Sequence, residues 1–178
     1  MKALRTIRLD SSDTFVFEQA AQPGEWAVSG AFVFAGIDPS ALTGKSRAAF
    51  RGGFLGIDSL GWSTLVQIVE ATEAERAHAV DVLARQLAEH FGAPNLAAAR
   101  AAAEQEVDFA VSLAQHPSGM LAAVSRTVEA GSIRETFRSL RPAARKPATA
   151  FAFLQVPGED EGSAEEVDLI NLAARGAR

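Results

Sequence analysis

Hydrophobic and polar residues alternate over much of the first 70 residues, and this pattern predicts β structure. Residues 6–9 alternate, and residues 14–17 are rich in β-forming side chains. Residues 26–34 form the strongest expected strand, with large side chains on one face and small ones on the other. A long loop over residues 36–47 and a glycine-rich turn then lead to a strand over residues 62–69.

The period changes to that of a helix after residue 70. Thr72 and Glu75 have the spacing of a capping box, and Gly92 is a natural helix terminator. Between them, apolar residues recur every three or four positions and form one stripe, Val80, Leu83, Leu87 and Phe91. A second helix is predicted from about Pro94 to about Gln115, with alanine at most positions of its stripe.

Alternation returns between Leu121 and Leu140 and predicts a β-hairpin around Ala130-Gly131. Pairing Glu129 with Ser132 sets three pairs on one face of the hairpin: Val128 with Ile133, Arg126 with Glu135, and Val124 with Phe137. Ser132 and Glu135 also fit a capping box, so a short helix starting there is the alternative.

The order of elements predicts an α+β fold. We expect a mostly antiparallel sheet, built from N- and C-terminal strands, packed against two central helices. The last strand is expected over residues 149–156, and a short C-terminal helix from about Ser163. One domain over residues 1–156 and an acidic tail over residues 157–178 follow from this reading.

The N-terminal stretch of the sequence resembles that of a known protein family. Residues 4–34, LRTIRLDSSDTFVFEQAAQPGEWAVSGAFVF, resemble the opening of a family of small, uncharacterised alphaproteobacterial proteins. A looser likeness covers residues 126–138. The resemblance carries over no activity and no catalytic residue.

The composition excludes several kinds of chemistry. Hydrophobic residues make up 48% of the chain and charged residues 22%, as in folded globular proteins. The absence of cysteine excludes disulfides, thiolate zinc sites, iron–sulfur clusters and cysteine nucleophiles. With three histidines, no tyrosine and no Gly-x-Ser-x-Gly, the sequence favours a protein that is not an enzyme, and we expect no cofactor or metal.

Charge is unevenly distributed along the chain. The net charge of −5 argues against a nucleic-acid partner. Residues 70–108 and the tail after Pro157 are acidic, whereas residues 126–146 hold six bases and two acids. This basic segment predicts a protein partner or self-association, with a homodimer as one form. The candidate partner-binding residues are Arg134, Arg138, Arg141 and Arg145.

The segment between Arg51 and Trp62 is the best candidate for a small-ligand site, because it holds four of the 14 glycines. Basic residues nearby suggest an anionic ligand, which Asp58 and Trp62 would orient, so the candidate residues are Lys45, Arg47, Arg51, Asp58 and Trp62. A β-hairpin with an irregular turn explains the same glycines. Gly44-Lys45-Ser46 is not a P-loop, because Pro39 stands where the motif has its first glycine and no convincing helix is expected to follow.

Two classes of function remain. The first is a non-catalytic binding or assembly protein. The alternative is a domain, or an enzyme, that binds an anionic small molecule in a pocket between the sheet and the helices. The N-terminus lacks the apolar core of a signal peptide, and the longest nearly apolar run, residues 26–37, is too short to cross a membrane. We therefore expect a cytoplasmic protein without membrane contact.

Overall fold

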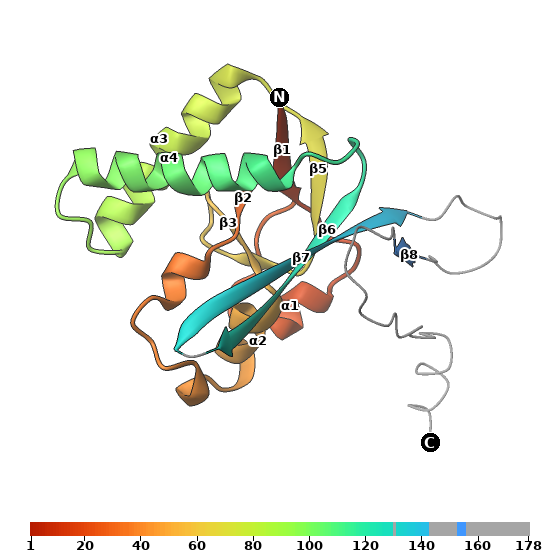
Figure 1. Cartoon of the computed structure of the whole chain (residues 1–178), viewed down its shortest axis with the longest axis horizontal. Helices are drawn as coiled ribbons and strands as arrows, with labels where there is room; N and C mark the ends of the chain where they lie inside the picture. The colour runs from red at the N-terminus through yellow and green to blue at the C-terminus, as the bar shows by residue number, and fades with distance from the viewer. Residues whose placement is uncertain (130, 143–152, 156–178) are drawn as a thin grey trace.

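Two antiparallel sheets form the framework of the protein (Figure 1). The computed structural model describes residues 1–129, 131–142 and 153–155. The larger sheet has the order β1-β5-β6-β7-β8, with strands Lys2–Thr6, Val66–Glu70, Leu121–Glu129, Ser132–Pro142 and Phe153–Gln155. The smaller sheet has the order β2-β3-β4, with strands Ala27–Val28, Phe54–Gly56 and Trp62–Ser63. A bridge between Arg5 and Trp26 joins the two sheets. The predicted α+β class is confirmed.

Two long helices, α3 (Glu73–His90) and α4 (Leu96–Leu113), pack against each other, and α4 also packs against β1 and β2 (Figure 1). The predicted capping box is present, because the Thr72 hydroxyl accepts from the Glu75 N–H and the Glu75 carboxylate accepts from the Thr72 N–H. The buried face of α4 consists of small side chains, Ala99, Ala103, Val107 and Ala110, which allow close packing. Both predicted helices are confirmed.

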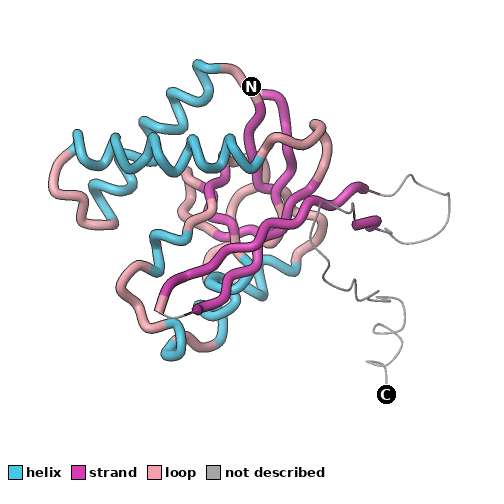
Figure 2. Tube along the Cα trace, in the orientation of Figure 1, coloured by secondary structure: helices cyan, strands magenta, loops and turns pink. Residues whose placement is uncertain are grey.

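The long β6–β7 hairpin has the predicted register. Glu129 pairs with Ser132, and the strands continue in antiparallel pairing to Leu121 and Leu140. Figure 2 shows the two strands side by side over their length. The alternative helix at Ser132 is wrong, because cross-strand pairing and apolar packing by Phe137 outweigh the local capping signal.

The strand predicted over residues 14–17 is wrong. These residues belong mainly to a one-turn helix, α1 (Ser12–Val16). Asp10 accepts a hydrogen bond from the Ser12 N–H, and Thr14 donates its hydroxyl hydrogen to the Ser11 carbonyl. Such local bonds from short polar side chains favour a helical turn over a strand.

The single strand predicted over residues 26–34 is also wrong. Strand β2 ends at Val28, and a 3-10 helix, η1 (Ala31–Phe34), follows. Gly30 lies between them at a φ of 77°, a left-handed conformation that ends the extended run. The Cβ of any larger residue there would lie 2.7 Å from the Cβ of Leu55.

The expected loop over residues 36–47 contains helical structure. It holds a 3-10 helix, η2 (Pro39–Ala41), and the start of α2 (Gly44–Gly52), so the expectation that no helix follows Gly44 is wrong. The irregular hairpin after Arg51 is confirmed, because β3 pairs with β4. The strand expected over residues 62–69 is divided into β4 and β5.

The remaining expectations concern the last strand, the C-terminal helix and tail, and membrane contact. Of the strand expected over residues 149–156, the structure describes β8; the expected helix from Ser163 and the tail lie outside the described residues. Within the described part, no helix has the length and apolar character needed to cross a membrane.

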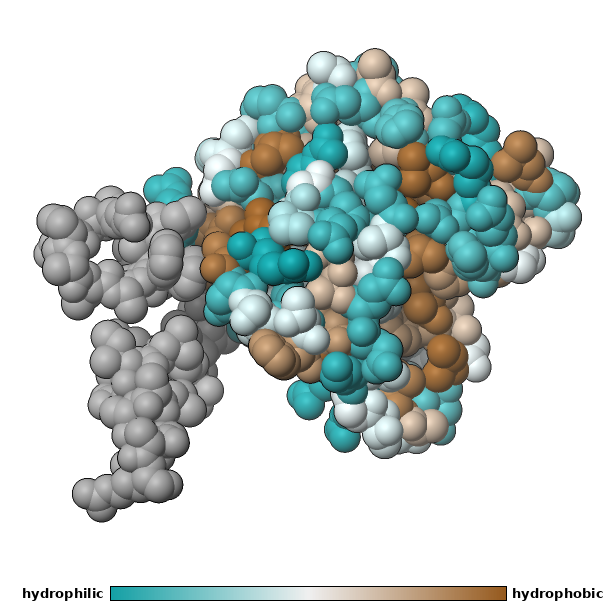
Figure 3. Space-filling view, turned by 180° about the vertical axis from the view of Figure 1, so that it is seen from behind, coloured by the Kyte–Doolittle hydropathy of each residue, from teal (hydrophilic) through white to brown (hydrophobic). Residues whose placement is uncertain are grey.

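Figure 3 shows hydrophobic residues in small patches separated by hydrophilic ones on one face of the protein. The described part of this face therefore lacks one broad apolar surface.

Candidate functional site

Arg126 is buried at the junction of the hairpin with the rest of the protein. It lies on β6, and only 1% of the residue is exposed. Its Nε donates to the Glu135 carboxylate on β7 at 2.7 Å, as the predicted pairing of these residues requires. Burial lowers the pKa of Arg126, and the charge and hydrogen bond of Glu135 oppose that shift.

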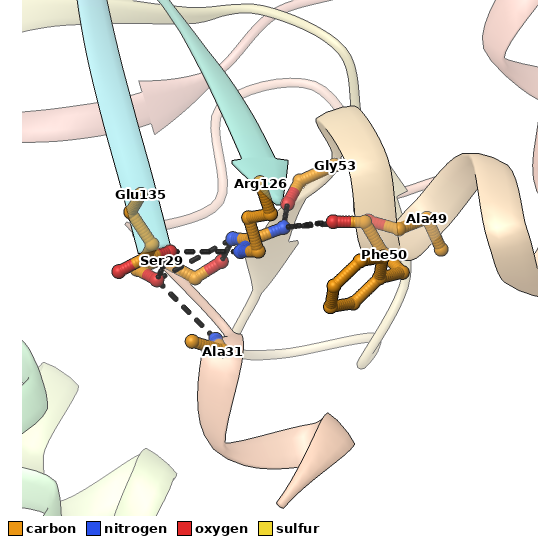
Figure 4. Close-up of polar contacts among 7 residues, drawn as sticks. All are labelled: Ser29, Ala31, Ala49, Phe50, Gly53, Arg126 and Glu135. Carbon is orange, nitrogen blue, oxygen red and sulfur yellow. Dashed lines mark hydrogen bonds and ion pairs between the residues drawn. The ribbon is translucent and has the colours of Figure 1, made fainter. Parts of the chain in front are cut away.

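The other nitrogens of Arg126 bind backbone carbonyls of distant segments (Figure 4). Nη1 donates to the carbonyls of Phe50 at 3.0 Å and Gly53 at 2.8 Å, and Nη2 donates to the Ser29 carbonyl. Phe50 and Gly53 lie at the C-terminal end of α2, where helix carbonyls lack partners within the helix. Arg126 therefore caps α2 and fastens the hairpin to both α2 and the segment after β2.

Two carboxylates lie near this arginine. Glu135 accepts the Ser29 hydroxyl at 2.5 Å in addition to Arg126. On α4, burial and the negative charge of Glu135 raise the pKa of Glu106, while Arg126 partly offsets that shift. Because Arg126 and Glu135 satisfy each other and Ser29, this cluster fixes the hairpin in place rather than presenting a reactive group.

The basic residues predicted to bind a partner fall on both faces of the hairpin. Side chains alternate along β7, so Arg134 and Arg138 lie on one face and Arg141 on the other. Arg134 and Arg138 are exposed, as are Ser125, Thr127 and Thr136 on the same face. The Arg134 Nε lies 2.7 Å from the Glu129 carboxylate. Arg145 lies outside the described residues.

One edge of β7 carries no neighbouring strand over residues 132–139 in the described part of the chain, because β8 pairs only with residues 140–142. In a hairpin with a two-residue turn, the pair that flanks the turn is hydrogen-bonded, and hydrogen-bonded pairs then alternate. Ser132 therefore bonds to β6, and so does every second residue after it. The backbone N–H and C=O groups of Ile133, Glu135, Phe137 and Ser139 point to the open edge.

The five predicted ligand-binding residues do not form one site. Lys45, Arg47 and Arg51 are exposed on α2. Trp62 is largely buried and stacks on Phe34 with ring centroids 5.3 Å apart. Trp62 thus belongs to the core, whereas the sequence analysis predicted that it would contact a ligand.

Of the five predicted ligand-binding residues, Asp58 lines a pocket in the described part of the protein. This pocket has a volume of about 440 Å³ and lies between α3, Arg5 of β1, Trp26 and the turn that follows β3. Arg5 lies over the Trp26 ring at 5.2 Å and forms an ion pair with Glu75 at 2.9 Å. Hydrogen bonds from Thr72 and the charge of Arg5 hold the pKa of Glu75 below its ordinary value. The other lining residues are Ile57, Asp58, Ala74, His78, Ala79 and Val82.

Comparison with protein families gives one match. A model described as "Family of unknown function (DUF6505)" matches residues 1–155, which include every element of the structure described above. The chain belongs to this family. The expected membership of an uncharacterised family is confirmed. No curated protein and no solved structure matches the chain. Membership in DUF6505 supplies no reaction and no ligand, so function has to be inferred from the surfaces of the protein.

Proposed function

We propose that this member of DUF6505 is a non-catalytic binding protein that takes up an extended, acidic segment of a partner protein along the open edge of β7. The observation that carries the proposal is the open edge itself, which is eight residues long in the described part of the chain and includes Arg134 and Arg138. A sheet edge binds an extended segment through backbone hydrogen bonds, and alternate side chains of the segment give specificity.

The position of the two arginines supports an acidic segment. An added strand would place every second side chain on the same face as Arg134 and Arg138. Acidic residues at these positions would pair with the arginines, and opposite charges on neighbouring strands stabilise pairing by about 0.2–1 kcal/mol each. Arg134 is 71% exposed, so its guanidinium is accessible to such a segment.

The buried Arg126 cluster supports the same proposal from the opposite side of the hairpin. A sheet edge binds a strand more tightly when the edge is already ordered in the free protein, because ordering the edge on binding costs free energy and lowers the affinity. Arg126 and Glu135 hold β6 and β7 against α2 and the segment after β2. The outer face and the edge are thus presented on a rigid support.

A second copy of the chain fits this edge less well. Two β7 edges could pair in an antiparallel arrangement with Thr136 of each copy at the centre. In that register the backbone groups of all four outward-pointing residues of each copy form hydrogen bonds. That register sets Arg134 opposite Arg138 of the second copy, and like charges directly opposite each other destabilise a sheet. We therefore favour a different protein as the partner and keep the homodimer as an outcome that the experiments can detect.

The setting of the proposed function comes from the sequence. The opening of the chain resembles a family of small alphaproteobacterial proteins. In our proposal the protein is an accessory protein of the bacterial cytoplasm. Its role would be to hold or to assemble the partner whose acidic segment it binds.

The experiment is a titration of the full chain with a fluorescent eight-residue peptide that alternates valine and glutamate. Reversing the charge in Arg134→Glu/Arg138→Glu is expected to weaken binding about tenfold or more, because two attractions become repulsions. Arg47→Glu/Arg51→Glu is the matched control, since it makes the same charge change at exposed positions on α2. Equal losses in the two variants, or no binding of the wild-type protein, would contradict the proposal.

A second candidate function is the binding of a small molecule in the pocket lined by Asp58. One observation favours it: Asp58 and His78 line the pocket without a hydrogen bond from either side chain to a described residue. These groups, with apolar side chains beside them, suit a small molecule that carries a cationic group. A thermal-shift screen of small amines tests this candidate, with stabilisation by a hit expected to disappear in Asp58→Asn.

A further inference from the structure

Helix α4 approaches β7 on the inner face of the hairpin, which is the face of Arg126, Glu135 and Phe137. Phe109 of α4 contacts Phe137, with ring centroids 5.8 Å apart and an angle of 74° between the rings. Phe109 is still 40% exposed, so this contact leaves part of its ring free. Glu106 lies three residues before Phe109 and therefore on the same side of α4. A strand added to the open edge would place its inner side chains next to this side of the helix.

The charges on the inner face do not balance. Glu135 forms an ion pair with Arg126 at 2.7 Å (Figure 4). Glu106 is half-buried, and no described residue forms a hydrogen bond or ion pair with its side chain. The charge of Glu135 acts on Glu106 and, with burial, raises the pKa of Glu106, as expected for two carboxylates that lie close together. Two carboxylates thus share one guanidinium, and one negative charge is left without a partner.

The register of the β7 edge determines which residue of an added strand would meet these carboxylates. The backbone groups of Ile133, Glu135 and Phe137 point to the open edge, so each has a hydrogen-bonded partner directly opposite it in an antiparallel strand. Side chains of directly opposite residues lie on the same face, with Cβ atoms about 5 Å apart. The residue opposite Glu135 would therefore lie beside the carboxylates, and the residue opposite Phe137 beside Phe109.

We propose that the partner segment carries a lysine or arginine opposite Glu135, and that Glu106 of α4 selects this residue. The inference rests on the proposed function for the strand that occupies the edge. The cation compensates the second carboxylate, and the methylene groups of its side chain cover apolar surface beside it. The neighbouring inner residue of the segment, opposite Phe137, is apolar and packs against Phe109. The acidic residues of the segment lie on its other face, so the two requirements do not conflict.

A second copy of the chain does not supply this cation. When two β7 edges pair about Thr136, Phe137 of the second copy lies directly opposite Glu135. The carboxylate of Glu106 would then stay without a partner inside a new interface, which is unfavourable. The charge of the inner face therefore supports a different protein as the occupant of the edge.

Three fluorescent eight-residue peptides test the pattern with the full-length protein. The reference peptide alternates valine and glutamate and begins with valine. Paired antiparallel with residues 132–139, it places its fifth residue, a valine, opposite Glu135. The second peptide has lysine at this central position. The third has lysine at the first position, opposite Ser139, which is about 13 Å further along the strand. The two lysine peptides have the same composition and net charge, so a difference in affinity reports the position of the charge.

The wild-type protein is expected to bind the peptide with the central lysine about fivefold more tightly than either of the others. Glu106→Gln should remove this preference and leave the affinity for the reference peptide nearly unchanged. Glu104→Gln is the matched control and should keep the preference, because it removes the same charge from an exposed position on α4 that pairs with Arg100.

Phe109 is tested with the same peptides. Phe109→Ala should weaken the binding of all three about fivefold, because the apolar residue opposite Phe137 loses its contact with α4. Phe15→Ala removes a phenylalanine that is 73% exposed on α1 and should change none of the affinities. Equal losses in the two variants would overturn the role assigned to Phe109.

The outcomes separate the failure of this inference from the failure of the proposed function. Equal affinities for the three peptides, or equal gains for the two lysine positions, would overturn the inference and leave strand addition in place. Retention of the preference in Glu106→Gln would also overturn it, since another group would then select the lysine. Absence of binding by all three peptides would overturn the inference and the proposed function together. A dimer in light scattering that the peptides convert into a monomer would identify a second copy as the occupant and overturn the choice of partner.

Discussion

Replacing Arg126 with methionine tests whether the buried cluster holds the hairpin to the rest of the protein. Methionine fills a similar length of space but has no donor. The variant would leave the Glu135 carboxylate without its cation and deprive the carbonyls of Ser29, Phe50 and Gly53 of a donor. Removing one partner of a buried ion pair destabilises a protein by about 3–5 kcal/mol.

We expect a loss of about 4 kcal/mol in the free energy of unfolding of Arg126→Met, measured by urea denaturation at pH 7. For a domain of this size that corresponds to a fall of about 8–16 °C in the melting temperature. Adding Glu135→Leu should recover part of the loss, because the orphaned charge disappears as well. Arg134→Met is the control, since this arginine is exposed and its loss should change stability by less than about 0.5 kcal/mol.

A loss below about 1 kcal/mol in Arg126→Met would refute this reasoning. It would mean that water or a rearranged backbone satisfies the three carbonyls at little cost. A double variant that is less stable than Arg126→Met would contradict the explanation in another way, because the stranded Glu135 would then not be the main source of the loss.

Three further predictions concern other parts of the fold. Burial and the charge of Glu135 raise the pKa of Glu106 above its ordinary value of 4.5, so the folded state binds the carboxyl proton more tightly than the unfolded chain does. The contribution of Glu106 to the free energy of unfolding therefore falls as the pH rises above 4.5. Glu106→Gln should therefore raise the urea midpoint at pH 7 and flatten its decline above pH 4.5; an unchanged pH profile would contradict this. Thr72→Ala should destabilise the protein by about 1 kcal/mol in the same assay by removing the cap of α3, and an unchanged midpoint would argue against a contribution from this cap. Gly61→Ala would place a Cβ 2.5 Å from the Ala21 nitrogen, and we expect a loss of about 1–3 kcal/mol; a midpoint equal to that of the wild-type protein would show that the backbone there can move.

The elements with strong local signals could be predicted from the sequence. The register of the β6–β7 hairpin follows from alternation on both sides of a two-residue turn, and it also determines that Arg126 faces Glu135. The start of α3 follows from the capping box at Thr72. In both regions the contacts that select the structure lie close together in the sequence.

The elements that were wrongly predicted depend on contacts between distant residues. Residues 26–34 alternate like one strand, but the close approach of Leu55 leaves room only for Gly30 in a left-handed conformation, and the strand ends. Burial of Arg126 was not predictable either, because its carbonyl partners on α2 are more than 70 residues away. A buried arginine has no sequence signal apart from an acidic cross-strand partner.

The candidate site shows the same division. The basic segment was recognisable from charge alone, and the hairpin register already implies that Arg134 and Arg138 share a face that Arg141 does not. The open edge of β7 was not predictable, because it depends on how far β8 extends along β7. The sequence analysis grouped Asp58 with the basic residues of α2 because they lie close together in the sequence. This grouping was wrong, because the pocket that Asp58 lines contains no residue of α2.

Amide hydrogen exchange with the valine–glutamate peptide tests the central claim most directly. The amides of Ile133, Glu135 and Phe137 point to the open edge, whereas the amide of Thr136 bonds to β6. The account predicts that saturating peptide slows exchange of the three edge amides by about tenfold or more and leaves Thr136 unchanged. Unchanged exchange at Ile133 and Glu135 in the presence of bound peptide would contradict strand addition at β7.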